Sequence, residues 1–295
     1  MSLNFRLTRS LRLPDYPSGS AITSYDDNFY IVGDDATSIL MVDADFHPVR
    51  TIKTEDYPEP RIPKPVKPDY ECSALVTEHD RPHLLVVGSA ATDMRRKMLL
   101  LPLTNHERSF QRFDSSVFVA RLKGLGIREI NLEGVTALNE EMLLTNRGNL
   151  GYPENHLIIT DTGFWKHQET APIRIVRLDL PAHVQSFAGL SDLTYLPQRD
   201  LLLMAFSSEQ TSNVYDDGAI GLSYLGWMSD FRSRLVSGNW ALNGLLTLPD
   251  LDAAFRGQKI EGICATSAAP SGKLQVQLVA DNDIGDTGVF ELSEI

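Results

Sequence analysis

The segment LEGVTALNEEMLLT, residues 132–145, contains two runs of apolar and β-branched residues on either side of a polar turn. Runs of about four to eight such residues, bounded by Gly, Asp, Asn or Pro, are typical of β-strands. The same order of opening motif, apolar run, polar turn and second run occurs five times along the chain. A unit repeated at a regular interval predicts a repeat architecture, here one built from strands.

The five opening motifs are spaced almost evenly. Their first residues are separated by 53, 62, 58 and 70 positions, and a fifth of the 295-residue chain is 59 positions. Five units therefore fill the chain. The motifs are Ser18–Ile22, Glu71–Leu75, Glu133–Leu138, Ser191–Leu196 and Glu261–Thr266.

Further along, polar loops lead to a third apolar run in each unit and to a fourth run in the first four units, so that each of these four predicts one four-stranded antiparallel blade. In the second unit the fourth strand is predicted at Val117–Leu122. Helical signal is scarce, and a single turn of helix is predicted at Leu251–Phe255.

The two ends of the chain complete one another. The fifth unit stops after its third strand, Val289–Leu292, and the N-terminal run Asn4–Leu13 resembles the fourth strand of the other units. Pairing these two strands closes a ring and removes the exposed edge of an open array. We therefore predict one all-β domain over residues 1–295, a β-propeller of about five blades. The alternatives are a six-bladed ring with a degenerate blade in Ser207–Trp240, or a β-sandwich.

The chain carries 39 acidic against 27 basic side chains, a formal net charge of −12. This acidity argues against a nucleic-acid partner, because binding phosphates requires clustered Lys and Arg. No apolar run reaches the roughly 18 residues of a membrane span, and residues 1–10 lack the apolar core of a secretory signal. We expect a cytoplasmic monomer that does not bind membranes, or a periplasmic one if a signal peptide has been removed.

In an antiparallel blade the start of the innermost strand lies beside the end of the second strand. The opening motifs and the second-strand ends must therefore share one face of the ring, around the mouth of a central channel. The opening positions are Ser18, Glu71, Glu133, Ser191 and Glu261, and the second-strand ends are Asp34, Ser89, Asn146, Ser207 and Asp281.

Carboxylates that converge on a narrow channel repel one another and raise each other's pKa. A divalent cation would relieve that repulsion, and carboxylate with amide oxygen donors suits Ca²⁺ or Mg²⁺ rather than Zn²⁺. In the alternative, the same side chains hydrogen-bond the backbone at the strand starts. The predicted metal ligands are Glu71, Glu133, Asn146, Glu261 and Asp281.

The loops on this face mix cations with carboxylates, as expected for a ligand site on a rigid scaffold. Arg147 is expected to bind an anion and to act in catalysis. His156 is expected to be the general base, the alternative being a partly buried strand residue. The predicted ligand-binding residues are Asp34, Lys97, Asn146, Arg147, Glu209 and Asn282.

Three short strand motifs are Leu132–Val135 (LEGV), Ile260–Ile263 (IEGI) and Val279–Asp283 (VADND). They resemble strand motifs of phytase-like and esterase-like β-propellers, including the family named for the esterase-like activity of phytase. The resemblance implies a propeller and a Ca²⁺-dependent phosphoester or ester hydrolase. The related families mostly have six blades, whereas the repeat in this chain predicts five.

The leading hypothesis is a metal-assisted hydrolase that acts on a small anionic ester, phosphoester or lactone at the channel mouth. The set Glu133, Asn146 and Asp281 is similar to the metal set of lactonase-type propellers. No GxSxG, P-loop, HExxH or CxxC motif is present, and no organic cofactor is expected. The alternative is a non-catalytic propeller that holds a peptide, a sugar or another protein on the same face, because propellers host many unrelated functions.

Overall fold

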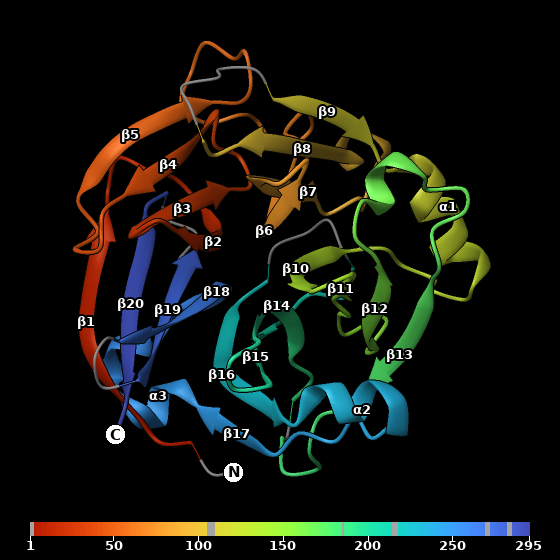
Figure 1. Ribbon diagram of the computed structural model, residues 1–295. Coiled ribbons are helices and arrows are strands. Elements are labelled where there is room, and N and C mark those ends of the chain that lie inside the picture. Colours follow the sequence, from red (N-terminus) through yellow and green to blue (C-terminus); the bar gives the residue numbers. More distant parts are fainter. Residues whose placement is uncertain (1–2, 105–109, 185, 214–217, 269–271, 282–284) are drawn as a thin grey trace.

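Five four-stranded antiparallel sheets surround a central axis as the blades of a β-propeller (Figure 1). The computed structural model describes residues 3–104, 110–184, 186–213, 218–268, 272–281 and 285–295. The prediction of an all-β propeller with five blades is confirmed, and the alternatives of a six-bladed ring and a sandwich are excluded.

Four of the blades are built from consecutive strands that run from the innermost strand outward. Blade 1 consists of β2 (Gly19–Tyr25), β3 (Asn28–Gly33), β4 (Ser38–Val42) and β5 (Pro48–Lys53). Blade 2 consists of β6 (Tyr70–Glu78), β7 (Arg81–Gly88), β8 (Lys97–Pro102) and β9 (Gln111–Asp114). Blade 3 consists of β10 (Leu132–Leu138), β11 (Glu141–Asn146), β12 (Asn155–Asp161) and β13 (Arg174–Leu178). Blade 4 consists of β14 (Gly189–Leu196), β15 (Leu201–Glu209), β16 (Ile220–Ser229) and β17 (Gly244–Thr247).

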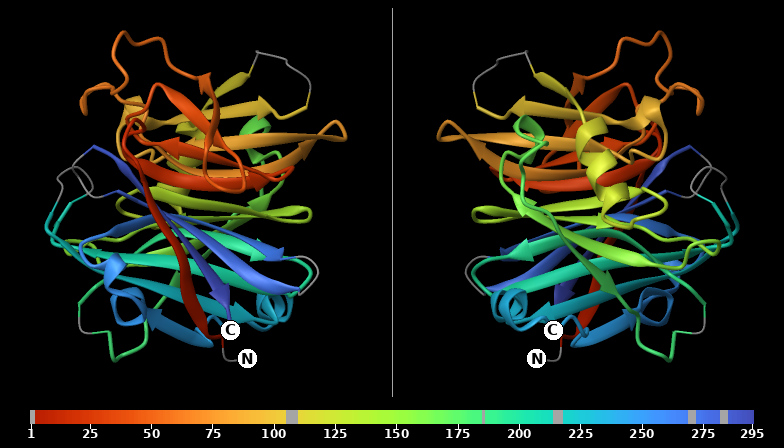
Figure 2. Two further views of the ribbon diagram at one scale, coloured as in Figure 1. Left: turned by 90° about the vertical axis from the view of Figure 1, so that its left-hand side faces the viewer. Right: turned by 90° about the vertical axis from the view of Figure 1, so that its right-hand side faces the viewer.

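Blade 5 joins the two ends of the chain. Its three inner strands are β18 (Lys259–Ala268), β19 (Lys273–Asp281) and β20 (Thr287–Glu294), and its outermost strand is β1 (Phe5–Leu13). β1 pairs antiparallel with β20, and the two strands lie side by side at the edge of the ring (Figures 1 and 2). The predicted closure is confirmed, and its physical basis is that β1 covers the edge that β20 would otherwise expose.

The second unit departs from the predicted strand pattern. Val117–Leu122 lies within helix α1 (Ser116–Gly124), and the fourth strand is β9 instead. Phe118, Val119 and Leu122 are buried against the apolar residues between blades 2 and 3, a spacing that one face of a helix provides. The prediction was wrong because periodicity does not separate a buried helix from a strand in so short an apolar run.

The remaining helices lie in connections between strands. The helical turn predicted at Leu251–Phe255 is confirmed in part by α3 (Leu248–Leu251) and η3 (Ala253–Phe255). The other helical elements of the described residues are α2 (Phe231–Ser237), η1 (Asp93–Arg95) and η2 (Phe164–Lys166). No helix in this part of the chain is long and apolar enough to cross a membrane.

Apolar side chains fill the interfaces between neighbouring blades. Leu85 of blade 2 and Leu144 of blade 3 belong to one such cluster, and Leu203 of blade 4 and Leu278 of blade 5 belong to another. All four are fully buried, and burying a leucine side chain contributes about 1.5–3 kcal/mol. Because the apolar contacts lie between the blades, the innermost strands are free to present polar groups along the axis.

Candidate functional site

A β-bulge recurs at the start of every innermost strand. In blade 3, for example, the pairing with β11 shifts by one residue between Leu132 and Gly134, which leaves Glu133 as the extra residue. A bulge leaves that residue unpaired and re-aims its side chain. In blade 1 this place belongs to Ser20 rather than to the predicted Ser18. The five equivalent residues are Ser20, Glu71, Glu133, Ser191 and Glu261.

Two of the bulged glutamates precede a glycine because the next blade approaches closely at that point. A Cβ atom at Gly134 would lie 2.9 Å from the Cα of Asp192 in blade 4. A Cβ atom at Gly262 would lie 2.8 Å from the Cα of Ala21 in blade 1. Close-packed backbone atoms cannot yield to contacts this short. The Glu-Gly pair therefore aims a carboxylate at the axis and leaves room for the neighbouring inner strand.

The second-strand ends are also equivalent, but in blade 3 the position belongs to Arg147 rather than to Asn146. The same backbone hydrogen bond marks it in three blades, where the strand-end N–H donates to the carbonyl two residues before the bulge. The donor and acceptor residues are Asp34 and Ser18 at 3.2 Å, Ser89 and Asp69 at 2.9 Å, and Arg147 and Asn131 at 2.9 Å.

The side chain of Asn146 is hydrogen-bonded to the backbone of the segment that precedes β10. Its Oδ1 accepts a hydrogen bond from the N–H of Asn131 at 2.8 Å, and its Nδ2 donates one to the carbonyl of Glu129 at 3.0 Å. Successive side chains of a strand point to opposite sides, so a shift of one residue exchanges the group that faces the axis. The structure therefore does not bring Asn146 together with the other predicted metal ligands, and Arg147 stands in its place.

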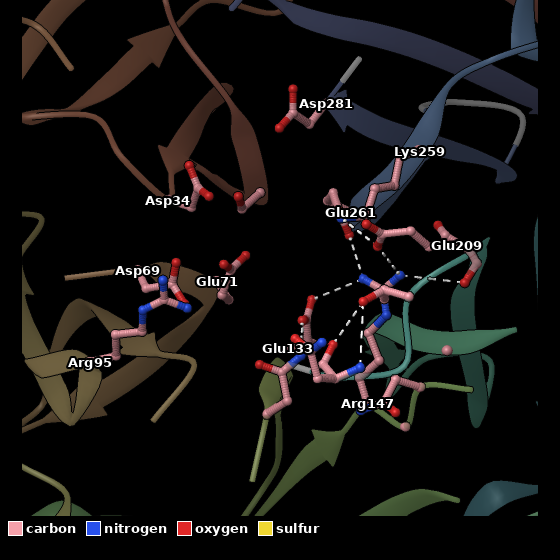
Figure 3. A pocket seen from close by; sticks show the side chains of 18 of the residues that line it. Asp34, Asp69, Glu71, Arg95, Glu133, Arg147, Glu209, Lys259, Glu261 and Asp281 are labelled. Carbon is pink, nitrogen blue, oxygen red and sulfur yellow. Dashed lines mark hydrogen bonds and ion pairs between the residues drawn. The ribbon is translucent and has the colours of Figure 1, made fainter. Parts of the chain in front are cut away.

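The channel mouth holds a polar pocket of about 100 Å³, into which side chains from all five blades converge (Figure 3). Among the described residues, its charged lining comprises seven carboxylates and five cations, so that acidic groups predominate. The carboxylates are Asp34, Asp69, Glu71, Glu133, Glu209, Glu261 and Asp281, and the cations are Lys64, Lys67, Arg95, Arg147 and Lys259.

The guanidinium of Arg147 lies in a buried network of ion pairs (Figure 3). Its Nη1 is 3.2 Å from Glu261 Oε2 and 3.5 Å from Glu133 Oε2. Its Nη2 is 3.4 Å from Glu209 Oε2. Lys259 Nζ lies 2.8 Å from Glu261 Oε1 and 3.0 Å from Glu209 Oε2. Two cations thus share three carboxylates that come from blades 3, 4 and 5.

Gly189, the first residue of β14, makes room for Arg147. A Cβ atom at Gly189 would lie 2.4 Å from Arg147 Nε and 2.5 Å from Arg147 Cγ. The positions two residues before the bulge carry side chains in the other four blades. Blade 4 therefore lacks a side chain at the point where Arg147 of blade 3 crosses to its carboxylate partners.

The carboxyl groups of this network differ in protonation. Burial raises the pKa of Glu133 to about 8, Arg147 opposes the rise and Glu261 adds to it. Burial also raises the pKa of Glu209, but Lys259 and Arg147 outweigh it and hold that pKa below its ordinary value. Near pH 7 the Glu133 carboxyl therefore carries a proton, whereas Glu209 is ionised. Asn131 Nδ2 donates a 2.5 Å hydrogen bond to Glu133 Oε1 and fixes the orientation of that carboxyl.

Across the pocket, Asp34, Asp69 and Glu71 form a carboxylate triad whose oxygen atoms lie within 4.8 Å of one another. Lys67 Nζ contacts Asp34 and lies 2.7 Å from Asp69 Oδ1. Arg95 Nη1 lies 2.7 Å from Asp69 Oδ2. Within the described part of the chain, Glu71 forms no hydrogen bond or ion pair, and Asp34 Oδ1 is buried without a hydrogen-bond partner.

The triad resists full ionisation. Burial raises the pKa of Asp34 to about 7, and this rise persists although Lys67 opposes it. Burial also raises the pKa of Glu71 well above its usual range, and the charges of Asp69 and Glu133 add to the rise. Positive charge added to this side of the pocket would therefore stabilise the ionised triad.

Lys97 and His156 do not line the pocket. Both belong to third strands, β8 and β12, which lie further from the axis than the second strands. His156 is buried, its ring lies 6.2 Å from the Tyr152 ring and its Nε2 lies 3.8 Å from Glu154 Oε2. Burial lowers its pKa, and its place fits the alternative of a partly buried strand residue.

The other predicted site residues fall into two groups. Asn282 lies outside the described residues. The predicted residues that line the pocket are Asp34, Glu71, Glu133, Arg147, Glu209, Glu261 and Asp281.

Five charged pocket residues lie outside the sequence predictions: Lys64, Lys67, Asp69, Arg95 and Lys259. Asp69 and Lys259 stand two residues before a bulged glutamate, and Lys67 lies in the Pro-rich segment that precedes blade 2. Alternate residues of an extended chain share a face. Asp69 and Lys259 could therefore have been predicted from their positions two residues before Glu71 and Glu261. Lys67 has no equivalent in the other units, and no repeat could predict it.

Fold and site together define a five-bladed β-propeller with a mainly acidic pocket at the mouth of its channel. Residues 15–293 match DUF6929, a family of unknown function, and the chain belongs to this family. No curated protein matches the sequence. The predicted resemblance to phytase-like proteins is therefore confirmed for the propeller fold only. The family that matches the chain is the family of unknown function.

Several solved structures share the fold at low sequence identity. A glycosyl hydrolase from Bacteroides ovatus is 10% identical with a TM-score of 0.51, over 94% of this chain and 84% of that chain. An N-acetylgalactosamine deacetylase from F. plautii is 10% identical with a TM-score of 0.50, over 100% of this chain and 95% of that chain. The tail fibre of Staphylococcus aureus phage P68 is 8% identical with a TM-score of 0.52, over 99% of this chain and 53% of that chain. At these identities the likeness establishes the fold alone.

Proposed function

We propose that the channel mouth is the active site of a metal-assisted hydrolase that acts on a small ester, phosphoester or lactone. The observation that carries this proposal is the carboxylate triad of Asp34, Asp69 and Glu71, whose oxygens lie within 4.8 Å of one another in the pocket wall. Clustered carboxylate oxygens are the ligands that Ca²⁺ and Mg²⁺ prefer in proteins. The triad is therefore the part of the pocket best suited to hold such an ion.

The charge distribution supports the triad over the other predicted ligands. Arg147 and Lys259 compensate the charge of Glu261, and Glu133 beside Arg147 carries a proton near pH 7, whereas Glu71 has no ion pair within the described residues. A divalent cation would oppose the burial and the repulsion that together raise the pKa of Glu71. The proposed ion site therefore lies between blades 1 and 2 rather than between Glu133 and Glu261.

The remaining groups have chemistry suited to hydrolysis. A bound divalent ion polarises a substrate oxygen and lowers the pKa of its bound water. The Glu133 carboxyl, protonated up to about pH 8 and facing the pocket, can donate its proton to a leaving oxygen. Arg147 orients Glu133 and keeps it near Glu261. In this assignment Arg147 positions an acid instead of binding the anion of the substrate.

A thermal-shift titration with CaCl₂, MgCl₂ or MnCl₂ tests the ion site. An ion that binds only the folded state at 100 times its Kd stabilises it by about 2.7 kcal/mol. We expect one of the three salts to raise Tm in the wild type and Glu71→Gln to lose that response. The matched control is Glu154→Gln, because Glu154 is a glutamate that pairs with Arg177 outside the pocket. No shift with any salt up to about 10 mM, a range that covers the weakest protein calcium sites, would remove the ion from the proposal.

A second candidate function is non-catalytic ligand binding at the same pocket. The observation that favours it is the saturation of Arg147, whose guanidinium already contacts three carboxylates and the carbonyl of Ser207. Hydrolysis of p-nitrophenyl acetate, p-nitrophenyl phosphate and a simple γ-lactone separates the two candidates. Turnover of one of them that disappears in both Glu71→Gln and Glu133→Gln supports the enzyme, and an ion-dependent shift without any turnover supports the binding protein.

A further inference from the structure

The segment of residues 56–69, which we call the strap, leads from blade 1 to blade 2 along the edge of the pocket. It contains five prolines, which favour an extended path. Its middle is anchored to blade 1, since the N–H of buried Ile62 donates to the carbonyl of Asp35 at 2.7 Å. Arg61 adds an ion pair with Asp35 at 2.7 Å. The C-terminal half of the strap, from Pro63 to Asp69, carries Lys67 into the pocket.

Lys67 is a buried cation held by carboxylates. Only 9% of the residue is exposed, and its ammonium contacts Asp34 and Asp69, two of the three members of the triad. Burial of a lysine disfavours its charged form, but the charges of Asp34 and Asp69 outweigh that cost and raise the pKa of Lys67. The triad therefore already holds one positive charge, and that charge belongs to a loop rather than to a strand.

The charge count on this side of the pocket shows what an arriving ion would meet. Asp34, Asp69 and Glu71 carry three negative charges when ionised, and Lys67 and Arg95 supply two positive ones. A divalent ion added beside Lys67 would leave an excess of one positive charge in a partly buried site. The same ion in place of Lys67 would leave the site neutral, and buried charges are tolerated when they are balanced.

We infer that Lys67 is an internal competitor for the divalent cation, so that the ion enters the triad by displacing the Lys67 ammonium and releasing the C-terminal half of the strap. This inference rests on the ion site of the proposed function and adds its regulation. When Lys67 is paired with the triad, the strap covers the edge of the pocket. When the ion is bound, the Lys67 side chain points into solvent. The backbone N–H groups of Val66 and Lys67, which donate to the carbonyl of Pro63 at 2.9 and 3.0 Å, report this change.

Removing the lysine charge while keeping its chain length tests the inference. If the Lys67 ammonium is away from the triad in about 10% or less of the wild-type molecules, Lys67→Met should lower the apparent Kd for the ion by at least about tenfold. Lys67→Met should also lower Tm in the absence of the ion, because Asp34 and Asp69 lose a partner. The control is Lys53→Met, because Lys53 pairs with the fully exposed Asp56 outside the pocket. Titration of the purified full-length variants with CaCl₂, MgCl₂ and MnCl₂ by calorimetry gives the affinities.

Hydrogen exchange on the wild type supplies a readout that does not depend on a variant. The ion should accelerate amide exchange at Val66 and Lys67 while Ile62 stays protected, whereas a simple gain of electrostatic attraction would leave the strap unchanged. If neither the wild type nor Lys67→Met binds any of the three ions, the ion site itself fails. If the wild type binds an ion, Lys67→Met binds it no more tightly and exchange at Val66 and Lys67 is unaltered, the site stands and the competition is refuted.

Discussion

Replacing Gly189 by alanine should dislodge Arg147 from its carboxylate partners. The new methyl group would lie 2.4 Å from Arg147 Nε, 2.5 Å from its Cγ and 2.9 Å from its Cδ. All three atoms belong to one side chain, so relief requires that side chain to move as a whole. Its guanidinium is held by Glu133, Glu209 and Glu261, which means that movement loosens buried ion pairs.

The expected loss of stability follows from two limits. Overpacking a close-packed site costs about 1–3 kcal/mol, and breaking a buried ion pair by removing one partner costs about 3–5 kcal/mol. Arg147 is displaced by Gly189→Ala but not removed, so we expect a loss of about 2–3 kcal/mol. For a chain of 295 residues, whose unfolding entropy is about 2.1 cal/mol/K per residue, that loss lowers Tm by roughly 3–5 °C.

Urea denaturation of four proteins measures the effect: the wild type, Gly189→Ala, Arg147→Ala and the double variant. If the clash with Arg147 is the cause, Gly189→Ala should cost less than about 0.5 kcal/mol in the Arg147→Ala background, which is the error of additivity for independent sites. Gly124→Ala is the control, because no atom beyond its chain neighbours and the backbone of its own helix lies within 4 Å of the position of its Cβ. An equal cost of Gly189→Ala with and without Arg147 would refute the reasoning.

Three further predictions concern pH and the ring. Because burial raises the pKa of Glu133 to about 8, folding binds a proton that the unfolded chain releases above about pH 4.5. The contribution of this proton to the free energy of unfolding is complete below about pH 4.5 and is lost as the pH rises toward 8, at up to about 1.4 kcal/mol per pH unit. Glu133→Gln should flatten this slope in urea denaturation across that range, and an unchanged slope contradicts the assignment. Asp192 accepts a hydrogen bond from the N–H of Ile263 in blade 5 at 2.8 Å, so Asp192→Ala should cost about 1–3 kcal/mol for the donor left unsatisfied. Asp192→Asn keeps an acceptor and should cost less, and equal losses in the two variants would show that the hydrogen bond is not the cause. Phe5 of the closing strand β1 is 3% exposed, and Phe5→Ala should lower the free energy of unfolding by about 3–5 kcal/mol, measured by thermal unfolding. Arg6→Ala, at an exposed position of the same strand, should be near neutral. Similar effects of the two substitutions would contradict the role of β1 in closing the ring.

The number of blades and their closure were predictable because both rest on short-range patterns. Alternation of apolar runs and polar turns defines each inner strand, and the unmatched run Asn4–Leu13 supplies the strand that the last unit lacks. The outer strands were less predictable. β9 is the polar run Gln111–Asp114 at the solvent-exposed edge of its blade, where burial imposes no pattern on the sequence.

Only those residues of the candidate site that occupy positions repeated in every unit could be predicted from the sequence. The motif that opens each unit identified Glu71, Glu133 and Glu261 as residues at the channel mouth. The second-strand ends were assigned one residue too early in blade 3, where the polar pair of Asn146 and Arg147 gives no indication of which side chain faces the axis. Register settles the choice, and register depends on pairing across the blade.

Local sequence thus determines that acidic groups gather at the channel mouth, because equivalent positions of a ring must converge on its axis. Only the tertiary structure decides which cation neutralises which carboxylate. Arg147 reaches Glu261 because blade 4 has a glycine where it crosses, and Lys67 reaches Asp34 from a strap outside the repeat. Ion pairs act over a few ångströms between residues far apart in sequence, so their partners are set by the packing of the blades and not by the order of residues along the chain.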